Sequence, residues 1–187
     1  FMIDRYTTPE MAKIWADKNK YETWKKVEIT VTEVLSDRGD IPKEAVKVIN
    51  EKAAFSVERI LEIEQTTRHD VIAFLTNLAE NIGPDSRFIH MGMTSSDLLD
   101  TSLALLCKEA GIIILGKLQT FKDVLRKQAL EHKESFQIGR SHGVHAEPIT
   151  FGLKLVLWSE EIGRHINRWE RAVESISTGK ISGAVGT

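Results

Sequence analysis

Apolar residues recur with helical spacing along most of this chain, separated by short polar segments. Residues 21–38 carry one apolar stripe, and Gly39 is placed to end that helix. Other helices are expected after Thr8, near Pro42 and after Ser56, because these residue types favour the first positions of helices. The pattern predicts an all-α fold.

Two longer helices are expected in the second half of the chain. The first covers residues 95 to about 132 without a proline, which is roughly 50 Å at 1.5 Å per residue. The second covers about 149–177. We therefore expect a small helical domain at residues 1–93, followed at residues 94–187 by the first part of a bundle of long helices.

Both long helices carry apolar residues around more than one face. A helix that is apolar nearly all round must be buried nearly all round, and the chain has too few other long helices to surround these two. Gly111 and Gly116 lower helix propensity, which is tolerable where a neighbouring helix approaches closely. We therefore expect copies of the same chain to provide the remaining cover.

Composition narrows the function classes. The 187 residues are 42% hydrophobic and 28% charged, with a net charge of −2, so there is no basic footprint for bulk binding of nucleic acid. The single cysteine, Cys107, cannot form a disulfide within the chain, and the sequence shows no signal peptide or membrane-spanning apolar segment. We expect a globular, cytoplasmic protein that binds anions only locally.

The first group of candidate catalytic residues lies between the two long helices, in residues 139–152. Gly139, Gly143 and Pro148 disfavour a continuous helix there, so the segment is predicted to be a loop. His142 is the first candidate for proton transfer, because imidazole can both give and take a proton near neutral pH.

The neighbours of His142 favour an anionic substrate, since Arg140 offers a fork of donors and Ser141 a hydroxyl. In the alternative interpretation, His142 and His145 are polar loop residues that bond backbone groups. A zinc site at these two histidines is disfavoured, because Gly143 prevents the single helical face that would converge both rings. No metal site is predicted.

A second candidate lies at residues 66–70, at the start of another expected helix. Asp70 is predicted to be the N-cap of that helix. Arg68 and His69 would then stand at a helix N-terminus, where free backbone N–H groups and the helix dipole favour an anion. The alternative is structural: Arg68 pairs with a nearby glutamate and His69 caps a turn.

A third candidate precedes the first long helix. Thr94, Ser95 and Ser96 provide hydroxyls, one of which is expected to cap the helix, and Asp97 suits its first turn. The same hydroxyls and N–H groups could receive a carboxylate or phosphate, with His90 just upstream. Capping and ligand binding remain open alternatives.

Two further segments are less specific. Arg5 and Tyr6 precede the first expected helix and form either a surface pair or part of a site. Residues 179–187 form a glycine-rich turn without the Lys-Ser/Thr ending of a phosphate-binding loop, so no nucleoside triphosphate site is predicted there.

Three of these blocks, in their order and spacing, resemble the fumarase and aspartase superfamily: Arg68-His69-Asp70, Thr94-Ser95-Ser96-Asp97 with Thr101, and Gly139-Arg140-Ser141-His142-Gly143-Val144-His145-Ala146-Glu147-Pro148. The His-Gly-Val-His-Ala-Glu-Pro form is similar to the branch that acts on succinylated purine nucleotides. The resemblance covers the whole chain. It implies β-elimination of fumarate from adenylosuccinate, giving AMP, and from the succinyl-carboxamide intermediate of purine synthesis. It also implies a homotetramer with a central helix bundle and shared active sites, without a metal or organic cofactor.

Roles for single residues follow from the same resemblance. His142 would protonate the departing nitrogen, and His69 would assist it and position the substrate. Thr94 and Ser95 would hold the succinyl carboxylate. Ser141 stands where the superfamily usually has threonine and keeps the hydroxyl. The nucleotide portion would be held by Arg5, Tyr6, Arg68 and Asp70.

The signature loop of the superfamily, with the serine taken as the base, would lie beyond residue 187. The chain is therefore expected to be the amino-terminal part of a longer enzyme and to be inactive alone. Two rival functions remain. One is another fumarate-releasing lyase, such as argininosuccinate lyase, or a relative of the carboxymuconate cycloisomerases. The other is a structural, crystallin-like protein, against which the retained His69 and His142 argue.

Overall fold

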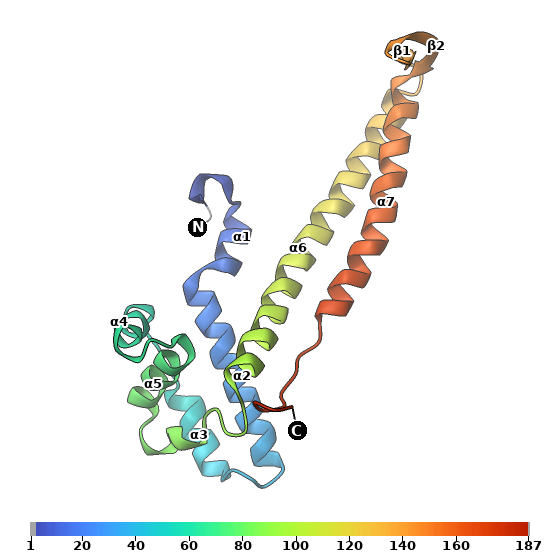
Figure 1. Cartoon of the computed structure of the whole chain (residues 1–187). Coiled ribbons are helices and arrows are strands. Elements are labelled where there is room, and N and C mark those ends of the chain that lie inside the picture. Colours follow the sequence, from blue (N-terminus) through green and yellow to red (C-terminus); the bar gives the residue numbers. More distant parts are fainter. Residues whose placement is uncertain (1–2, 187) are drawn as a thin grey trace. The chain divides into compact units, whose positions relative to one another are not determined.

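The computed structural model describes residues 3–186, and helices make up most of this part of the chain (Figure 1). The chain divides into two compact units, Phe1–Cys107 together with Ser177–Thr187, and Lys108–Ile176. The strands of the described residues form one two-stranded sheet. Because helices form nearly all of the remaining regular structure, the predicted all-α fold is confirmed apart from this small sheet.

The first unit contains the shorter helices. Their bounds are Pro9–Trp15 for α1, Asp17–Asp37 for α2, Lys43–Lys52 for α3, Val57–Thr67 for α4 and Asp70–Ile82 for α5. Two short 3-10 helices, η1 (Asp4–Tyr6) and η2 (Pro84–Phe88), lie before α1 and after α5. The long helix α6 (Ser95–Glu131) begins in this unit.

Side-chain caps set the predicted helix starts. The hydroxyl of Thr8 accepts the N–H of Met11 at 3.4 Å, and the hydroxyl of Ser56 accepts the N–H of Arg59 at 3.2 Å. Gly39, with a φ of 88°, lies just past α2 in a conformation that disfavours other residues. The starts predicted after Thr8 and Ser56, and the end at Gly39, are confirmed.

An aromatic cluster forms the centre of this unit. Tyr21 stacks on Phe74 with ring centroids 5.8 Å apart, and Trp24 meets Phe74 edge-on at 5.4 Å. Aliphatic residues of α3, α4, α5 and α6 complete the core: Ile49, Ile60, Val71, Leu78 and Leu98. Full burial of such a side chain contributes roughly 1.5–3 kcal/mol. The core therefore holds the helix ends that carry candidate site residues.

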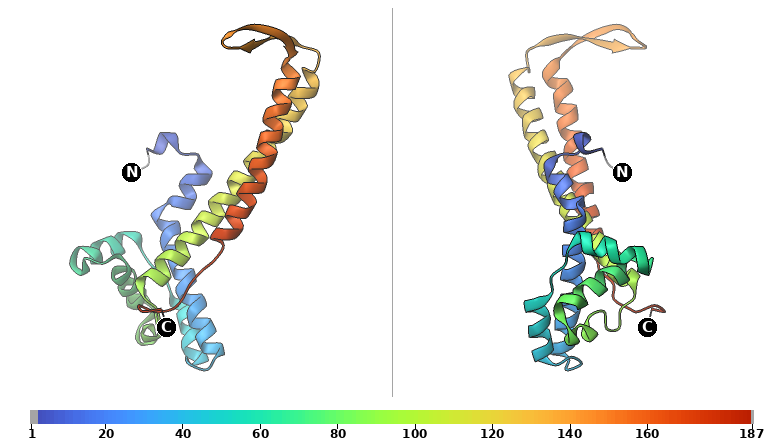
Figure 2. Two further views of the ribbon diagram at one scale, coloured as in Figure 1. Left: turned by 45° about the vertical axis from the view of Figure 1, so that its right-hand side comes forward. Right: turned by 90° about the vertical axis from the view of Figure 1, so that its left-hand side faces the viewer.

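The second unit is a helical hairpin. It consists of α6 after Cys107 and of α7 (Phe151–Ile176), which are joined by the strands β1 (Phe136–Ser141) and β2 (Val144–Thr150). Both views in Figure 2 show the two helices side by side. Within the described residues, no helix combines the length and apolar character needed to cross a membrane.

Glycine allows α6 and α7 to approach closely. A Cβ at Gly111 would lie 2.6 Å from Val173 Cγ2, and the Trp169 indole N–H donates to the Gly111 carbonyl at 2.8 Å. The close approach predicted at Gly111 is confirmed. A Cβ at Gly116, in contrast, would meet nothing within 4 Å among the described residues.

Residues 139–152, predicted to be a loop, mostly form an antiparallel β-hairpin instead. Residues 136–138 pair with 148–150, and the register shifts between Ile138 and Arg140, which places a bulge at Gly139. Pro148 is accommodated because each strand of a two-stranded sheet has an outer edge that needs no N–H donor. The loop prediction was wrong because glycine and proline exclude a helix but not a bulged edge strand.

Candidate active site

Arg68 lies at the junction between α4 and α5. It follows the last residue of α4 in a left-handed conformation, with a φ of 52°, and its backbone N–H donates to the Glu64 carbonyl at 2.9 Å. Its guanidinium has no hydrogen bond or ion pair among residues 3–186. The structural alternative is therefore wrong for Arg68, whose guanidinium stays available to an anion, whereas its other part, a capping role for His69, is confirmed.

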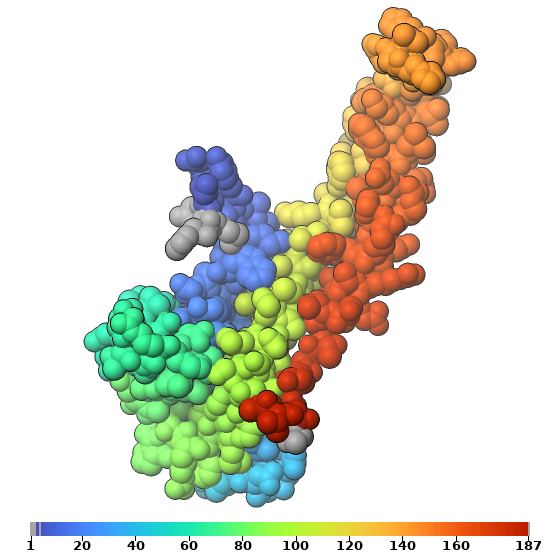
Figure 3. Space-filling model, in the orientation of Figure 1, coloured from blue at the N-terminus to red at the C-terminus, as the bar shows by residue number. Residues whose placement is uncertain are grey.

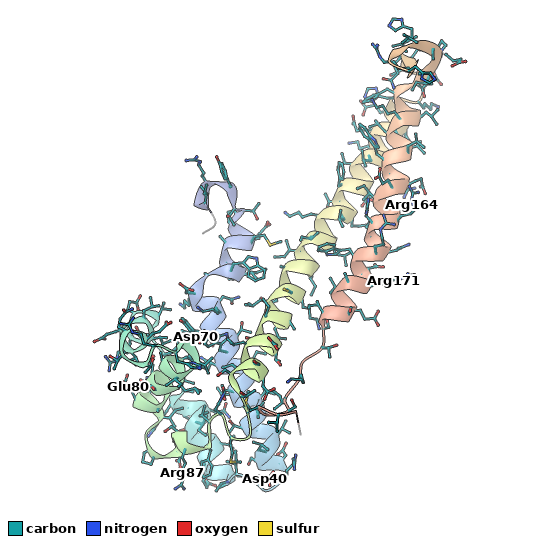
Figure 4. All side chains as sticks on the ribbon, in the orientation of Figure 1. Asp40, Asp70, Glu80, Arg87, Arg164 and Arg171 are labelled. Carbon is teal, nitrogen blue, oxygen red and sulfur yellow. The ribbon has the colours of Figure 1, made fainter. Side chains whose placement is uncertain are left out.

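His69, rather than Asp70, is the N-cap of α5. The Nδ1 of His69 accepts the N–H of Ile72 at 3.4 Å. Asp70, labelled in Figure 4, is the first helical residue, and its carboxylate accepts the N–H of Val71 at 2.8 Å. The N-cap predicted at Asp70 was wrong, because the side chain of His69 takes that position. Nδ1 also lies 3.5 Å from Asp70 Oδ1, and Nε2 forms no hydrogen bond or ion pair within the described residues, so Nε2 can contact a ligand.

The start of α6 is capped by a carboxylate. Asp97 Oδ2 accepts the backbone N–H of Thr94 at 3.0 Å, and the N–H of Asp97 donates to the Thr94 carbonyl at 3.0 Å. Within the described residues, no hydroxyl of Thr94, Ser95 or Ser96 forms a hydrogen bond. The prediction that one of these hydroxyls caps the helix was wrong, since Asp97 takes that role. The hydroxyls therefore stay available to a ligand.

A buried carboxylate that the sequence analysis missed holds His90. Glu28, on α2, is fully buried, and its Oε1 lies 2.6 Å from His90 Nδ1. Its Oε2 accepts the backbone N–H of His90 at 2.9 Å. These contacts fix the ring and leave Nε2 for other partners. The two residues are 62 positions apart, so no local sequence pattern could have shown the pair.

Arg5 and Tyr6 contact each other at η1. The Arg5 Nη2 donates to the Tyr6 hydroxyl at 3.1 Å, and the guanidinium carbon lies 4.9 Å from the ring centroid. Both side chains are exposed. This geometry is that of a surface pair, and it leaves the face of the ring opposite the guanidinium open to solvent or a ligand.

Ser141 and His142 lie at the tip of the hairpin. His142 and Gly143 have φ of 53° and 77° and form the two-residue turn between β1 and β2. Ser141 and His142 are exposed, and neither side chain has a hydrogen bond within residues 3–186. His145 has none either, so the interpretation of these histidines as backbone-bonding loop residues is wrong. The turn presents an unengaged imidazole and hydroxyl.

The candidate residues are divided between the two compact units. Ser141 and His142 belong to the second unit, and the other candidates belong to the first. His142 does not line either of two hollows in the second unit, which have volumes of about 400 and 570 Å³. Among the described residues, no group of three or more His, Cys, Asp or Glu side chains could hold a metal ion.

Comparison with known proteins gives consistent matches. A model of the lyase family matches residues 4–187. The chain is 50% identical over 186 residues to the adenylosuccinate lyase of Bacillus subtilis (strain 168) and 53% identical over 186 residues to that of Synechocystis sp.. In both matches 100% of this chain is covered, but it spans only 43% of the relative's length. The fold is similar to that of a fumarate lyase from Mesorhizobium sp. BNC1, with a TM-score of 0.92 at 23% identity, covering 97% of this chain and 44% of that one.

Proposed function

Because this chain belongs to the lyase family, we propose that it is part of an adenylosuccinate lyase. Such an enzyme releases fumarate from adenylosuccinate, giving AMP, and from succinyl-aminoimidazole carboxamide ribotide. The proposal is carried by an identity of about half, over the whole chain, to proteins of that name. The chain spans 43% of their length, and we propose that it corresponds to their amino-terminal part.

The reaction moves one proton from carbon to nitrogen. A base takes the proton from the carbon beside a carboxylate, and the electron pair left behind forms the double bond of fumarate. The carbon–nitrogen bond breaks, its electrons stay on nitrogen, and an acid protonates that nitrogen. We assign the acid to His142, whose exposed ring has no competing hydrogen bond within the described residues, and an assisting role to His69.

The anionic groups of the substrate match the unengaged groups of the first unit. The hydroxyls of Thr94 and Ser95 would hold the succinyl carboxylate, because Asp97 leaves them unbonded at a helix N-terminus. The free guanidinium of Arg68 suits a phosphate or a nearby polar group. Ser141 would contact the substrate beside the acid. The remaining nucleotide contacts are assigned to Arg5, Tyr6 and Asp70.

The test is fumarate release by the full-length protein. We expect release from adenylosuccinate, none from argininosuccinate, and no conversion of a carboxymuconate. The variant His142→Ala should lower turnover by at least about 100-fold while the substrate still binds. His165→Ala is the matched control, since His165 is an exposed imidazole on α7 that we place outside the site. A His142→Ala enzyme near wild-type turnover would remove this residue from the mechanism, and an inactive wild type would overturn the function.

We also propose a cytoplasmic homotetramer in which residues 94–187 enter a central bundle and residues 1–93 form a separate helical domain. Exposed apolar residues along α6 and α7 support the assembly. We expect residues 1–187 alone to release no fumarate, because the proposed base lies in a segment outside them. Sustained AMP production by a preparation of verified mass would contradict this expectation.

A further inference from the structure

The glycine-rich tail is attached to the first turns of α6. The backbone N–H of Lys180 donates to the Thr101 hydroxyl at 3.1 Å, and that hydroxyl donates to the Lys180 carbonyl at 3.2 Å. A Cβ at Gly179 would lie 2.9 Å from Thr101 Cγ2, so glycine permits this close contact. In Figure 3 the red tail lies against the yellow-green start of α6. Residues 179–183 and the start of α6 are therefore parts of one compact unit.

The carboxylate of Asp97 joins the two segments and is fully buried. Its Oδ2 accepts the N–H of Thr94 at 3.0 Å and that of Gly183 at 2.9 Å. Its Oδ1 accepts the N–H of Ser182 at 3.2 Å and lies 3.3 Å from the Lys180 ammonium. Because a carboxylate offers about four lone-pair positions, these donors fill its acceptor capacity. Asp97 has no position left for a substrate.

The charge of Asp97 is compensated where it lies. Burial alone would raise the pKa of Asp97, but the backbone N–H groups and the Lys180 ammonium lower it below its ordinary value. The group is therefore ionised at neutral pH. Its charge is opposed by Lys180 and by the positive end of the α6 dipole. A second carboxylate can therefore approach the neighbouring hydroxyls without facing an uncompensated anion.

We propose that Asp97 is a positioning residue for the substrate carboxylate. It caps α6 in place of the hydroxyls of Thr94 and Ser95, and it holds the tail against the same turn. Both hydroxyls are thereby kept unbonded and fixed for the succinyl carboxylate. This inference rests on the proposed function, and Asp97 acts through these two residues without touching the substrate.

The variant Asp97→Asn in the full-length protein tests this role. Asparagine keeps the size of the side chain but turns an amide NH₂ toward groups that are themselves donors. We expect the dissociation constant for fumarate and the KM for adenylosuccinate to rise about tenfold or more, a loss typical of hydrogen bonds to a charged group. The dissociation constant for AMP should stay within about twofold, because the nucleotide is held elsewhere. Asp100→Asn is the matched control, since Asp100 is exposed on the same helix and should change none of these values.

The outcomes distinguish a failure of the proposed function from a failure of the positioning role of Asp97. Wild-type protein that releases no fumarate from adenylosuccinate overturns the function itself. An active wild type with unchanged fumarate affinity in Asp97→Asn overturns the positioning role, and so do equal losses for fumarate and AMP, which indicate general loosening. If Asp97→Asn does not fold, Asp97→Ala decides, because it removes every bond of the carboxylate without turning an amide NH₂ toward the same donors. Weaker fumarate binding with unchanged AMP binding supports the role, and unchanged fumarate binding overturns it.

Discussion

Three residues other than glycine have a positive φ in the part of the chain that the structure describes: Arg68, His90 and His142, with values of 52°, 63° and 53°. The left-handed conformation costs such residues roughly 1–2 kcal/mol. Strained backbone is concentrated at functional sites, and each of these residues lies in one of the three blocks or just upstream of one. Their coincidence supports the roles proposed for Arg68 and His142. It also singles out His90, whose ring Glu28 holds.

Two substitutions at Arg68 separate its side chain from its backbone. Arg68→Ala and Arg68→Gly both remove the guanidinium, so we expect the KM for adenylosuccinate to rise about tenfold in each. Glycine adopts a φ of 52° without strain, so the glycine variant should be about 1 kcal/mol more stable than the alanine variant. Steady-state kinetics and urea unfolding measure the two effects. An unchanged KM would exclude the nucleotide contact, and equal stabilities would exclude the strain.

The lowered pKa of Asp97 predicts a defined dependence of stability on pH. A carboxyl group whose pKa is lowered in the folded state stabilises the fold at pH values above its unfolded-state pKa, which is about 3.9. This contribution is lost as pH falls through the folded-state pKa. The stability difference between wild type and Asp97→Asn should therefore be constant from about pH 7 to pH 5, begin to shrink near pH 4, and be lost only as pH falls further through the lowered pKa of Asp97. Urea unfolding of both proteins across this range measures it. A difference that grows toward acid pH has the wrong sign for this assignment.

At the scale of elements, the β-hairpin depends on how α6 and α7 meet beneath it. The N–H of Gly152, near the start of α7, donates to the His132 carbonyl at 2.9 Å, just past the end of α6. A Cβ at Gly152 would lie 2.5 Å from the Ala129 carbonyl oxygen and 2.8 Å from the His132 carbonyl oxygen. Backbone atoms cannot turn away as a side chain can. The contact between the start of α7 and the residues that follow α6 therefore requires glycine.

Two glycines of α7 should respond to alanine in opposite ways. Gly152→Ala forces the helix ends apart and should destabilise the protein by about 1–3 kcal/mol, as overpacking does. Gly163→Ala would meet only the end of the flexible Lys122 side chain, with Nζ at 3.2 Å. It should be neutral or stabilise the helix by roughly 0.5–1 kcal/mol. Thermal melting of the full-length variants compares them, and a Gly152→Ala protein as stable as Gly163→Ala would refute the backbone contact.

At the scale of the whole molecule, the second unit leaves large apolar side chains uncovered. Exposed large apolar residues of this unit lie on both helices. They include Ile112, Phe121, Val124 and Leu130 on α6, and Leu153, Val156, Leu157 and Trp158 on α7. Contiguous apolar patches beyond several hundred Å² mark interaction surfaces, and closed symmetry is the common way to cover them. Two long helices with such faces favour a bundle built from several copies.

Shared active sites give this assembly a direct test. In the proposed tetramer, His69 of one copy meets His142 of another. Mixing inactive full-length His69→Ala and His142→Ala proteins, unfolded and refolded together, should therefore restore part of the activity. In a mixed tetramer, some sites would contain wild-type His69 from one chain and wild-type His142 from another. Failure to regain activity in proven mixed tetramers would exclude shared sites, and light scattering of a monomer at micromolar concentration would exclude the assembly.

The sequence by itself determined the features that depend on neighbours along the chain. Helical periodicity predicted the two long helices, and the caps at Thr8 and Ser56 followed from hydroxyls that reach an N–H three residues on. The order of the three blocks pointed to the lyase superfamily because each block is a short local string. The sequence also placed Ser141 and His142 between the long helices, but it did not predict the β-hairpin in which they lie.

Only the tertiary structure decided the features that depend on distant partners. The sequence placed Asp97 in the first turn of a helix, but two of the groups that donate hydrogen bonds to its carboxylate lie 85 and 86 positions away along the chain. Those donors, the N–H groups of Ser182 and Gly183, make it a link to the tail. In the sequence, Glu28 is one polar residue among others on a helix, and only the fold shows that it contacts His90. The hairpin likewise formed because backbone groups of residues 136–150 satisfy one another across two strands. The physical reason is common to all three: a buried carboxylate or an unpaired backbone group must find partners, and the folded chain determines which ones lie within reach.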